Sequence, residues 1–173
     1  MQAILLILIV TFTSLFLPED IPAEAPHWYR PTVYNDYIDF FDAEGEKVGR
    51  LAFDPASSKA HFTARNISLT FQTKGFYDGE IKIANKITRN LIGIIRKQNR
   101  KRNTLLMSDG RTYRIDLKEM TIWEDDVLLL QFQEKNKNEF VVQSYVHNEQ
   151  EMLELNAILM YGRIAWIFSG GNR

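Results

Sequence analysis

The densest group of chemically capable side chains in this sequence is a basic run at positions 96–102. Five cations fall within seven residues there, in a chain whose 21 basic and 22 acidic side chains otherwise nearly cancel. Such a run creates a local positive potential, and each cation near a membrane surface contributes about 1 kcal/mol toward contact with anionic lipid. A solvated hairpin tip, whose charges discourage edge-to-edge aggregation, is the plainer interpretation. The candidate lipid- or anion-binding residues are Arg96, Lys97, Arg100, Lys101 and Arg102.

Other functional classes lack the residues that they need. A nucleic-acid site would interleave aromatic side chains with the cations, and none occurs between Arg89 and Arg102, so we expect no nucleic-acid partner. The chain has no cysteine, and its three histidines share no metal-ligand spacing with an acidic residue. The acidic run 124–126 is typical of a solvated turn rather than a calcium loop. Without a phosphate-binding glycine loop or a nucleophile elbow, we expect a protein that is not an enzyme and needs no cofactor or metal.

The N-terminus is built for an apolar environment. Residues 1–17 carry no charged side chain. As a helix they span roughly 25 Å, against ~30 Å for the hydrocarbon core of a bilayer. An uncleaved membrane anchor explains this segment best, because the apolar run ends sharply at Pro18 and two acidic residues follow it. The alternatives are a cleaved signal peptide, whose small-residue site at 23–25 is obstructed by Pro26, and a segment buried in the fold.

A proline-rich stretch follows at 18–33 and holds four of the five prolines. Proline removes backbone donors and restricts the residue before it, so this stretch predicts an extended linker. We therefore divide the chain into a signal-anchor or signal peptide at 1–17, a linker at 18–33 and a single folded domain at 34–173.

From Tyr34 onward, apolar and polar residues alternate with the period of two that is typical of β-strands. Turn residues separate the segments, for example Ser108-Asp109-Gly110. The expected strands are 34–41, 48–53, 61–63, 67–71, 76–83, 91–96, 104–107, 113–117, 120–123, 127–133 and 140–145.

Two of these segments echo one another. Val48-Gly49-Arg50-Leu51 is answered by Ile92-Gly93-Ile94-Ile95, and the two glycines lie 44 residues apart. The spacing suggests a weak duplication of a four-strand meander, too short for a solenoid. We interpret the copies as two arcs of one sheet.

One helix comes late in the chain. Asn148 and Glu151 form a cap-like start, and Met152, Leu155 and Leu159 recur at helical spacing. The stretch 157–161 is apolar all round, which is the pattern of a helix enclosed by protein. Gly162 predicts the helix end, and 163–168 predicts a closing β-strand.

About a dozen strands and one apolar helix together predict a sheet that closes into a barrel. A strongly twisted sheet of that size tends to close or split, and closure around the helix buries the helix on every side while removing exposed sheet edges. We predict a mainly β fold, in which a closed antiparallel barrel of about twelve strands encloses the hydrophobic C-terminal helix, with an additional apolar helix at the N-terminus.

This arrangement resembles the tubby C-terminal superfamily, which includes the phospholipid scramblase-like and LURP-one-related proteins. The resemblance covers about 34–168 and rests on strand order, the glycine-containing hairpins and the helix-Gly162-strand ending. It implies a barrel of roughly twelve strands threaded by a hydrophobic helix. It also implies a non-enzymatic role in which basic surface residues bind phosphoinositide headgroups, or the domain associates with membranes in another way.

Three functions follow as hypotheses. The first is a membrane-associated module, held by residues 1–17, that binds anionic lipid headgroups through the 96–102 run. The second is a secreted or periplasmic lipocalin-like carrier of a small apolar ligand, which requires a hollow barrel with the helix outside. The third is a structural or protein-interaction domain without a small ligand.

Overall fold

The computed structural model describes residues 27–33, 36–54, 58–73, 79–98, 102–136 and 138–168, and for 27–33 it describes the backbone alone. The elements are twelve strands and one helix: β1 (His27–Val33), β2 (Tyr37–Phe41), β3 (Lys47–Asp54), β4 (Lys59–Ala64), β5 (Ile67–Thr73), β6 (Glu80–Asn85), β7 (Leu91–Lys97), β8 (Asn103–Met107), β9 (Thr112–Asp116), β10 (Thr121–Glu124), β11 (Val127–Asn136), β12 (Glu139–Ser144) and α2 (Glu149–Phe168).

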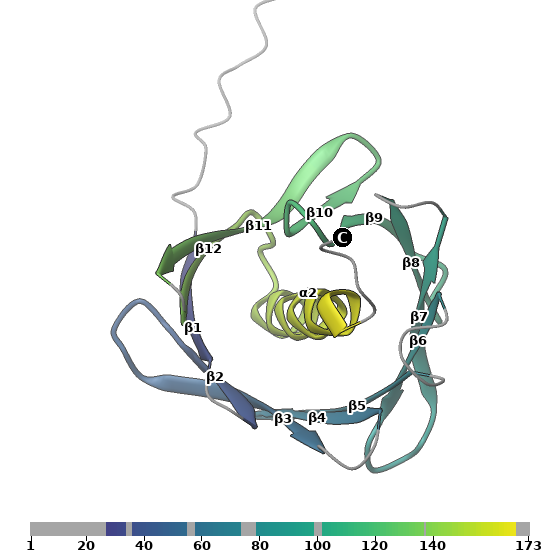
Figure 1. Ribbon diagram of the computed structural model, residues 1–173, viewed down its shortest axis with the longest axis horizontal. Helices are drawn as coiled ribbons and strands as arrows, with labels where there is room; N and C mark the ends of the chain where they lie inside the picture. Colours follow the sequence, from purple (N-terminus) through teal and green to yellow (C-terminus); the bar gives the residue numbers. More distant parts are fainter. Residues whose placement is uncertain are drawn as a thin grey trace, which may run out of the picture.

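The strands form one antiparallel sheet in sequence order. The eleven strands from β2 to β12 make a continuous sheet in which each strand pairs with the next. β1 pairs with β12 on one side and with β2 on the other, which completes a closed barrel. Figure 1 shows the ring of strands around α2. The expected mainly antiparallel β fold with a C-terminal helix is confirmed, whereas an N-terminal helix at 1–17 lies outside the described residues.

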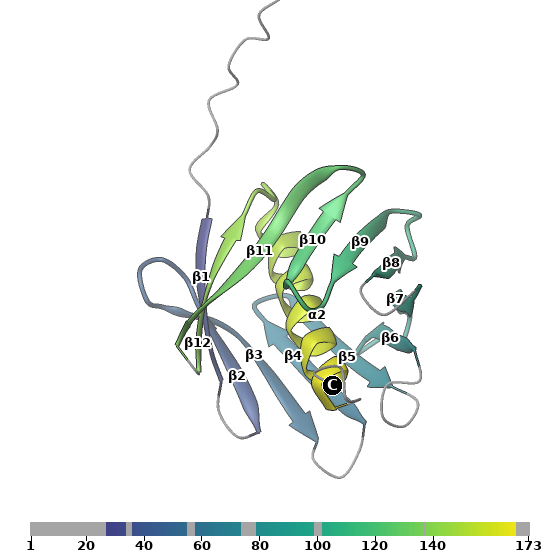
Figure 2. The same ribbon diagram turned by 45° about the horizontal axis from the view of Figure 1, so that its top comes forward.

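The barrel has two distinct ends because every strand runs opposite to the one before it. We call the end where α2 begins the entry end; it carries the start of β1 and the turns 42–46, 65–66, 86–90, 108–111 and 125–126. We call the end where α2 finishes the exit end; it carries the connection between β7 and β8 and the turn 117–120. Figure 2 shows α2 running along the barrel between them.

The core lies between α2 and the inward side chains of the strands. Ala157, Ile158 and Leu159 are fully buried, and Met160 is 2% exposed. Tyr161 stacks on Phe71 with ring centroids 4.9 Å apart. Burial of each large apolar side chain contributes about 1.5–3 kcal/mol, so the fold depends chiefly on enclosing this helix. The expectation that 157–161 is surrounded by protein is confirmed.

The predicted end of the helix at Gly162 is wrong, as is the strand at 163–168, because α2 continues to Phe168. A Cβ atom at Gly162 would lie 2.8 Å from Cδ2 of Leu117, a side chain that is 1% exposed. Gly162 is therefore explained by the close approach of the helix to the turn 117–120. The β-branched and aromatic residues of 163–168 remain helical because the helix packs against the barrel wall, and packing overrides weak local propensity.

The predicted linker at 18–33 ends too late, because β1 occupies His27–Val33 and belongs to the barrel. Pro31 lies within β1 opposite Phe40, and the pairing of β1 with β12 skips Arg30 and Pro31. Proline is tolerated in a strand where its missing N–H is not needed by the neighbouring strand. The predicted count of about a dozen strands agrees with the structure only because two errors cancel. The prediction omitted β1 and included a strand at 163–168.

The echo between Gly49 and Gly93 corresponds to a repeated irregularity in the sheet. The register shifts between Phe40 and Phe41 opposite β3, and between Ile83 and Ala84 opposite β7. In each case the residue immediately before the glycine is the one left without a partner. A Cβ atom at Gly49 would lie 3.0 Å from the Phe62 ring, and one at Gly93 would lie 3.1 Å from the Leu106 carbonyl oxygen. Both glycines permit close approach beside a bulge, as expected of two related arcs.

Candidate functional site

The described residues of the basic run, Arg96, Lys97 and Arg102, lie on the β7–β8 hairpin at the exit end. Lys97 pairs with Asn103, and the Gln98 amide donates a 3.0 Å hydrogen bond to the Arg102 carbonyl oxygen. Arg96 forms an ion pair of 3.2 Å with Glu80 on β6. Arg100 and Lys101 lie outside the described residues. The structure thus places Arg96, Lys97 and Arg102 on one hairpin, with the charge of Arg96 partly offset by Glu80.

The next turn at the exit end, 117–120, brings a further cation close to this hairpin. Adjacent strands are about 4.8 Å apart, so two turns separated by two strand positions lie roughly 10 Å apart. The turn is held by the Asp116 carboxylate, which accepts 2.9 Å hydrogen bonds from the amides of Lys118 and Glu119. Met120 adopts a φ of 53°, which is uncommon for a residue with a long side chain. The turn thereby holds Met120 inward and Lys118 outward.

A cleft of about 400 Å³ opens between this turn, the strands β11 and β12, and the last turns of α2. Six of the ten residues that line it are apolar and four are charged. The residues that line it are Lys118, Glu119, Met120, Phe132, Glu134, Phe140, Met160, Arg163, Ile164 and Ile167. A volume in this range is large enough for a small molecule.

Arg163 is the most unusual of these residues because it is a half-buried cation in the otherwise apolar second half of α2. One guanidinium nitrogen donates a 3.0 Å hydrogen bond to the Leu117 carbonyl oxygen, and the guanidinium lies 4.6 Å from the centre of the Trp166 ring. Burial lowers its pKa from the usual range for arginine. The structure gives Arg163 no ion pair with a carboxylate among the described residues. Its remaining donors can therefore bind an anion that enters the cleft.

The other charges around the cleft are more exposed. Lys118 and Glu119 form an ion pair of 3.4 Å, with about two thirds of each side chain exposed. Glu134 is also exposed, and its field raises the pKa of Arg163 without offsetting the effect of burial. The mouth of the cleft therefore carries two cations, Arg163 and Lys118, and two carboxylates, Glu119 and Glu134.

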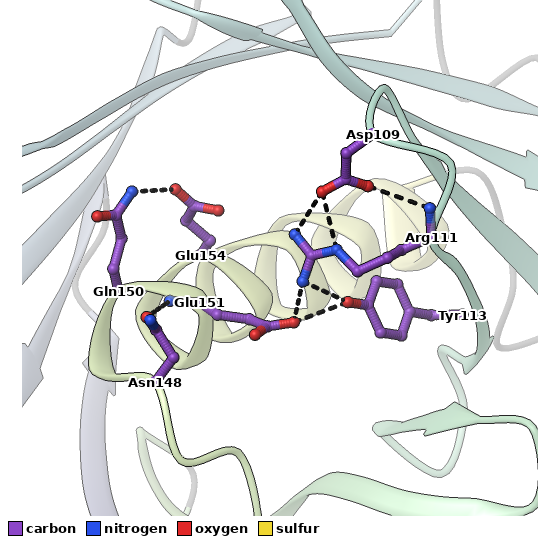
Figure 3. A network of polar contacts seen from close by, with 7 residues as sticks. All are labelled: Asp109, Arg111, Tyr113, Asn148, Gln150, Glu151 and Glu154. Carbon is purple, nitrogen blue, oxygen red and sulfur yellow. Dashed lines mark hydrogen bonds and ion pairs between the residues drawn. The ribbon is translucent and has the colours of Figure 1, made fainter.

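A second polar cluster lies at the entry end and fixes the start of α2 (Figure 3). The Tyr113 hydroxyl donates a 2.7 Å hydrogen bond to Glu151, and Arg111 contacts the same carboxylate. Arg111 also binds Asp109, and this bond holds the pKa of Asp109 below its ordinary value. Burial raises the pKa of Tyr113 well above that of a free tyrosine. Because each of these groups is satisfied by another, the cluster joins the helix to the β8–β9 turn rather than forming a site.

The remaining sequence candidates stay dispersed. His61 contacts Thr70 on the outer wall at 3.2 Å, and burial lowers its pKa. Asp126 is fully exposed at the β10–β11 turn, 3.9 Å from Arg114. Within the described part of the chain, no group of acidic or histidine side chains is arranged to hold a metal ion. Nor does any helix of that part have the length and apolar character needed to cross a bilayer.

Comparison with known proteins supports the architecture. The chain is similar to the X-ray structure of a protein from Arabidopsis thaliana, with a TM-score of 0.57 and 13% sequence identity, over 82% of this chain and 93% of that one. The two chains share a fold. At this level of identity the likeness extends to the fold alone. No family model and no curated protein matches the sequence.

Sequence reasoning missed the cleft because its walls are distant in the chain. The turn 117–120, the strands β11 and β12, and residues 160–167 meet only in the folded barrel. Arg163 was assigned to a strand, where a single cation has no special meaning. The available signal was that Arg163 is the one charge in the apolar stretch 157–168.

Proposed function

We propose that this chain is a tubby-like, non-catalytic membrane-associated module that binds anionic lipid headgroups at the exit end of its barrel. The observation that carries the proposal is the position of the basic hairpin beside the turn 117–120. Lys97 and Arg102 of the first turn and Lys118 of the second face the same end of the molecule. Several cations at one end allow simultaneous contact with a flat anionic surface.

The N-terminal segment adds a geometric condition to this proposal. β1 starts at the entry end, whereas the basic hairpin lies at the exit end. α2 has 20 residues and is therefore about 30 Å long. The nine residues 18–26 reach at most about 30 Å when extended. The reach of the linker is thus about equal to the length of α2, so an anchor at 1–17 and the basic hairpin can contact the same bilayer when the linker extends along the barrel.

The carrier hypothesis receives less support from the fold. A carrier of the lipocalin type needs a hollow barrel, and here the interior is occupied by α2 with Ile158 and Leu159 fully buried. The cleft at the exit end is open to the surface and does not extend along the barrel axis, since the core residues of the strands contact the helix there.

A protein-interaction role is the second candidate, and exposed apolar residues favour it. Ile87 is 81% exposed and Val127 is 63% exposed, and both lie at the entry end with the less exposed Leu91 and Tyr145. Single exposed apolar residues are common, but four around one rim of the barrel offer apolar contacts to a protein partner. This role would leave the exit-end cations without effect on binding.

Partition between vesicles and solution tests the proposal. The full chain is mixed with phosphatidylcholine vesicles, with and without phosphatidylserine, and sedimented; the neutral vesicles measure any contribution of residues 1–17. We expect the double variant Lys97→Glu/Lys101→Glu to lose most of the increment that phosphatidylserine provides. At about 1 kcal/mol for each cation, neutralisation alone weakens binding by about thirtyfold.

The matched control is Lys86→Glu/Arg89→Glu, which makes the same change in net charge in the turn 86–90 at the entry end. Equal losses in the two double variants would indicate a nonspecific charge effect. An unchanged increment in the Lys97→Glu/Lys101→Glu variant would exclude the basic hairpin as the headgroup site.

A further inference from the structure

We propose that the exit-end cleft binds one molecule of a single-chain anionic amphiphile, with its charged headgroup on Arg163 and its hydrocarbon chain among the apolar residues of the cleft. This inference concerns a pocket for one molecule, whereas the basic hairpin concerns a lipid surface. It does not depend on binding by Lys97 or Lys101.

The walls of the cleft are suited to a hydrocarbon chain. Met120 and Phe132 are 6% and 4% exposed, and Met160 is 2% exposed, so the inner part is lined by side chains that have little contact with solvent. Phe132 and Phe140 contact each other edge to face, with ring centroids 6.3 Å apart, and form one wall. Ile167, at the outer end of the opposite wall, is 41% exposed. Such a ligand would cover the apolar surface of Phe140, Ile164 and Ile167, which the fold leaves partly open to water.

The headgroup preference follows from Arg163. Its guanidinium is half-buried, and the contacts described for it are the Leu117 carbonyl oxygen and the Trp166 ring. The fields of Glu134, Glu119 and Asp116 reach the guanidinium, but the contacts described for it include no carboxylate. A carboxylate or phosphate on a ligand supplies a direct ion pair and two acceptor oxygens that suit the planar guanidinium.

The size and the rim of the cleft restrict the ligand further. A volume of about 400 Å³ lies near the lower limit for small-molecule pockets, which favours one chain over a two-chain lipid. Glu134 stands at the rim and Glu119 is paired with Lys118. A bulky headgroup would approach these carboxylates, so a small anionic headgroup is preferred. Fatty acids and single-chain lipid phosphates share this chemistry.

Isothermal titration of the full chain with dodecanoate, dodecyl phosphate and dodecanol, each below its aggregation concentration, tests the inference. We expect saturable binding of one molecule per chain for the two anions, and binding at least about tenfold weaker for dodecanol, which has the same chain and no charge. A preference for dodecanoate over dodecyl phosphate, or the reverse, distinguishes the two headgroup sources. Equal binding of dodecanol, or no saturable binding of either anion, would overturn the proposal.

Three variants assign the site. Arg163→Met keeps the length of the side chain without its charge, and we expect about tenfold to a hundredfold weaker anion binding with little change for dodecanol. Arg163→Lys keeps the charge and the fold but loses the planar pair of donors, so intermediate binding is expected. Glu134→Gln removes the rim carboxylate and should strengthen anion binding. If none of these changes alters binding, the ligand lies elsewhere.

The basic-hairpin variant separates this proposal from the proposed function. Lys97→Glu/Lys101→Glu should lose vesicle binding and retain dodecanoate binding. The converse result, vesicle binding intact without any amphiphile binding by the wild-type chain, would reject the pocket and leave the surface function standing.

Discussion

The hydroxyl of Tyr113 in β9 donates a 2.7 Å hydrogen bond to the carboxylate of Glu151 in the first turn of α2, 38 residues further along the chain. Arg111 of the same strand region contacts the same carboxylate. At the exit end, Tyr161 donates a 3.0 Å hydrogen bond to the Ser58 carbonyl oxygen and Arg163 donates one to Leu117. Polar contacts at both ends of the barrel therefore fix the position of α2 along the barrel axis. This keeps the exit-end cleft in place.

Tyr113→Phe should destabilise the protein. The substitution keeps the buried ring and removes the hydroxyl that binds a charged acceptor, so we expect a loss of about 1–3 kcal/mol in the free energy of unfolding, measured in urea. The control is Gln150→Ala, which removes an exposed contact with Glu154 on the same turn and should change stability by less than about 0.5 kcal/mol. Equal effects of the two changes would mean that the Tyr113 bond contributes no more than a surface contact.

Gly162→Ala should also destabilise the protein, although alanine is the better helix former. In an exposed helix the change gains about 1 kcal/mol, but here the new methyl group would lie 2.8 Å from the buried Leu117 side chain. We expect a cost of about 1–3 kcal/mol from this overpacking. In a Leu117→Ala background the same change should become neutral or stabilising, because the obstructing atoms are gone. Stabilisation in the wild-type background would show that Leu117 moves aside freely.

Asn156→Leu should stabilise the protein. Asn156 is fully buried in α2, and neither its amide nitrogen nor its carbonyl oxygen has a hydrogen-bond partner among the described residues. Replacing an unsatisfied buried amide by an apolar side chain of similar size removes a penalty of about 1–3 kcal/mol. Urea unfolding measures the gain. A loss of stability would reveal that the amide has a partner in the folded protein, such as a bound water molecule.

Acid should weaken the outer wall at Asp39. Its carboxylate binds Arg50 at 2.6 Å and Lys47 at 2.9 Å, and the bonds to Arg50 hold its pKa below the ordinary value of 3.8. As pH falls below about 4, the unfolded chain takes up a proton that the folded chain resists, so this contribution is present above that pH and is lost below it. Asp39→Asn should therefore reduce the acid sensitivity of unfolding, whereas Asp126→Asn, at a fully exposed carboxylate, should not. The same acid dependence in wild type and Asp39→Asn would contradict this assignment.

The sequence predicted the elements whose pattern is local. Alternation located β2 to β12, and the uniform apolar character of 157–161 correctly indicated an enclosed helix. Two errors arose where tertiary contacts override local preference. Gly162 looked like a helix end but serves the contact with Leu117, and the prolines before Val33 looked like a linker although β1 uses that backbone for pairing with both neighbouring strands.

The site was predicted only where it is continuous in sequence. Arg96, Lys97 and Arg102 lie on a hairpin tip as a basic turn between strands should. Arg163 and Met120 could not be joined by inspection, because the close approach of the turn 117–120 to the last turns of α2 depends on the helix continuing past Gly162. If α2 ended at Gly162, the helical residues 163–167 would not be present to form one wall of the cleft.

The absence of cysteine allows the membrane-facing end to be measured directly. An environment-sensitive fluorophore is attached to Gln98→Cys at the exit end or to Ala43→Cys at the entry end, both exposed turn positions without charge. On addition of vesicles containing phosphatidylserine, we predict a blue shift for the label at position 98 and little change for the label at position 43. A shift confined to position 43 would place the entry end on the lipid and contradict the central claim that the exit end is the lipid-binding surface.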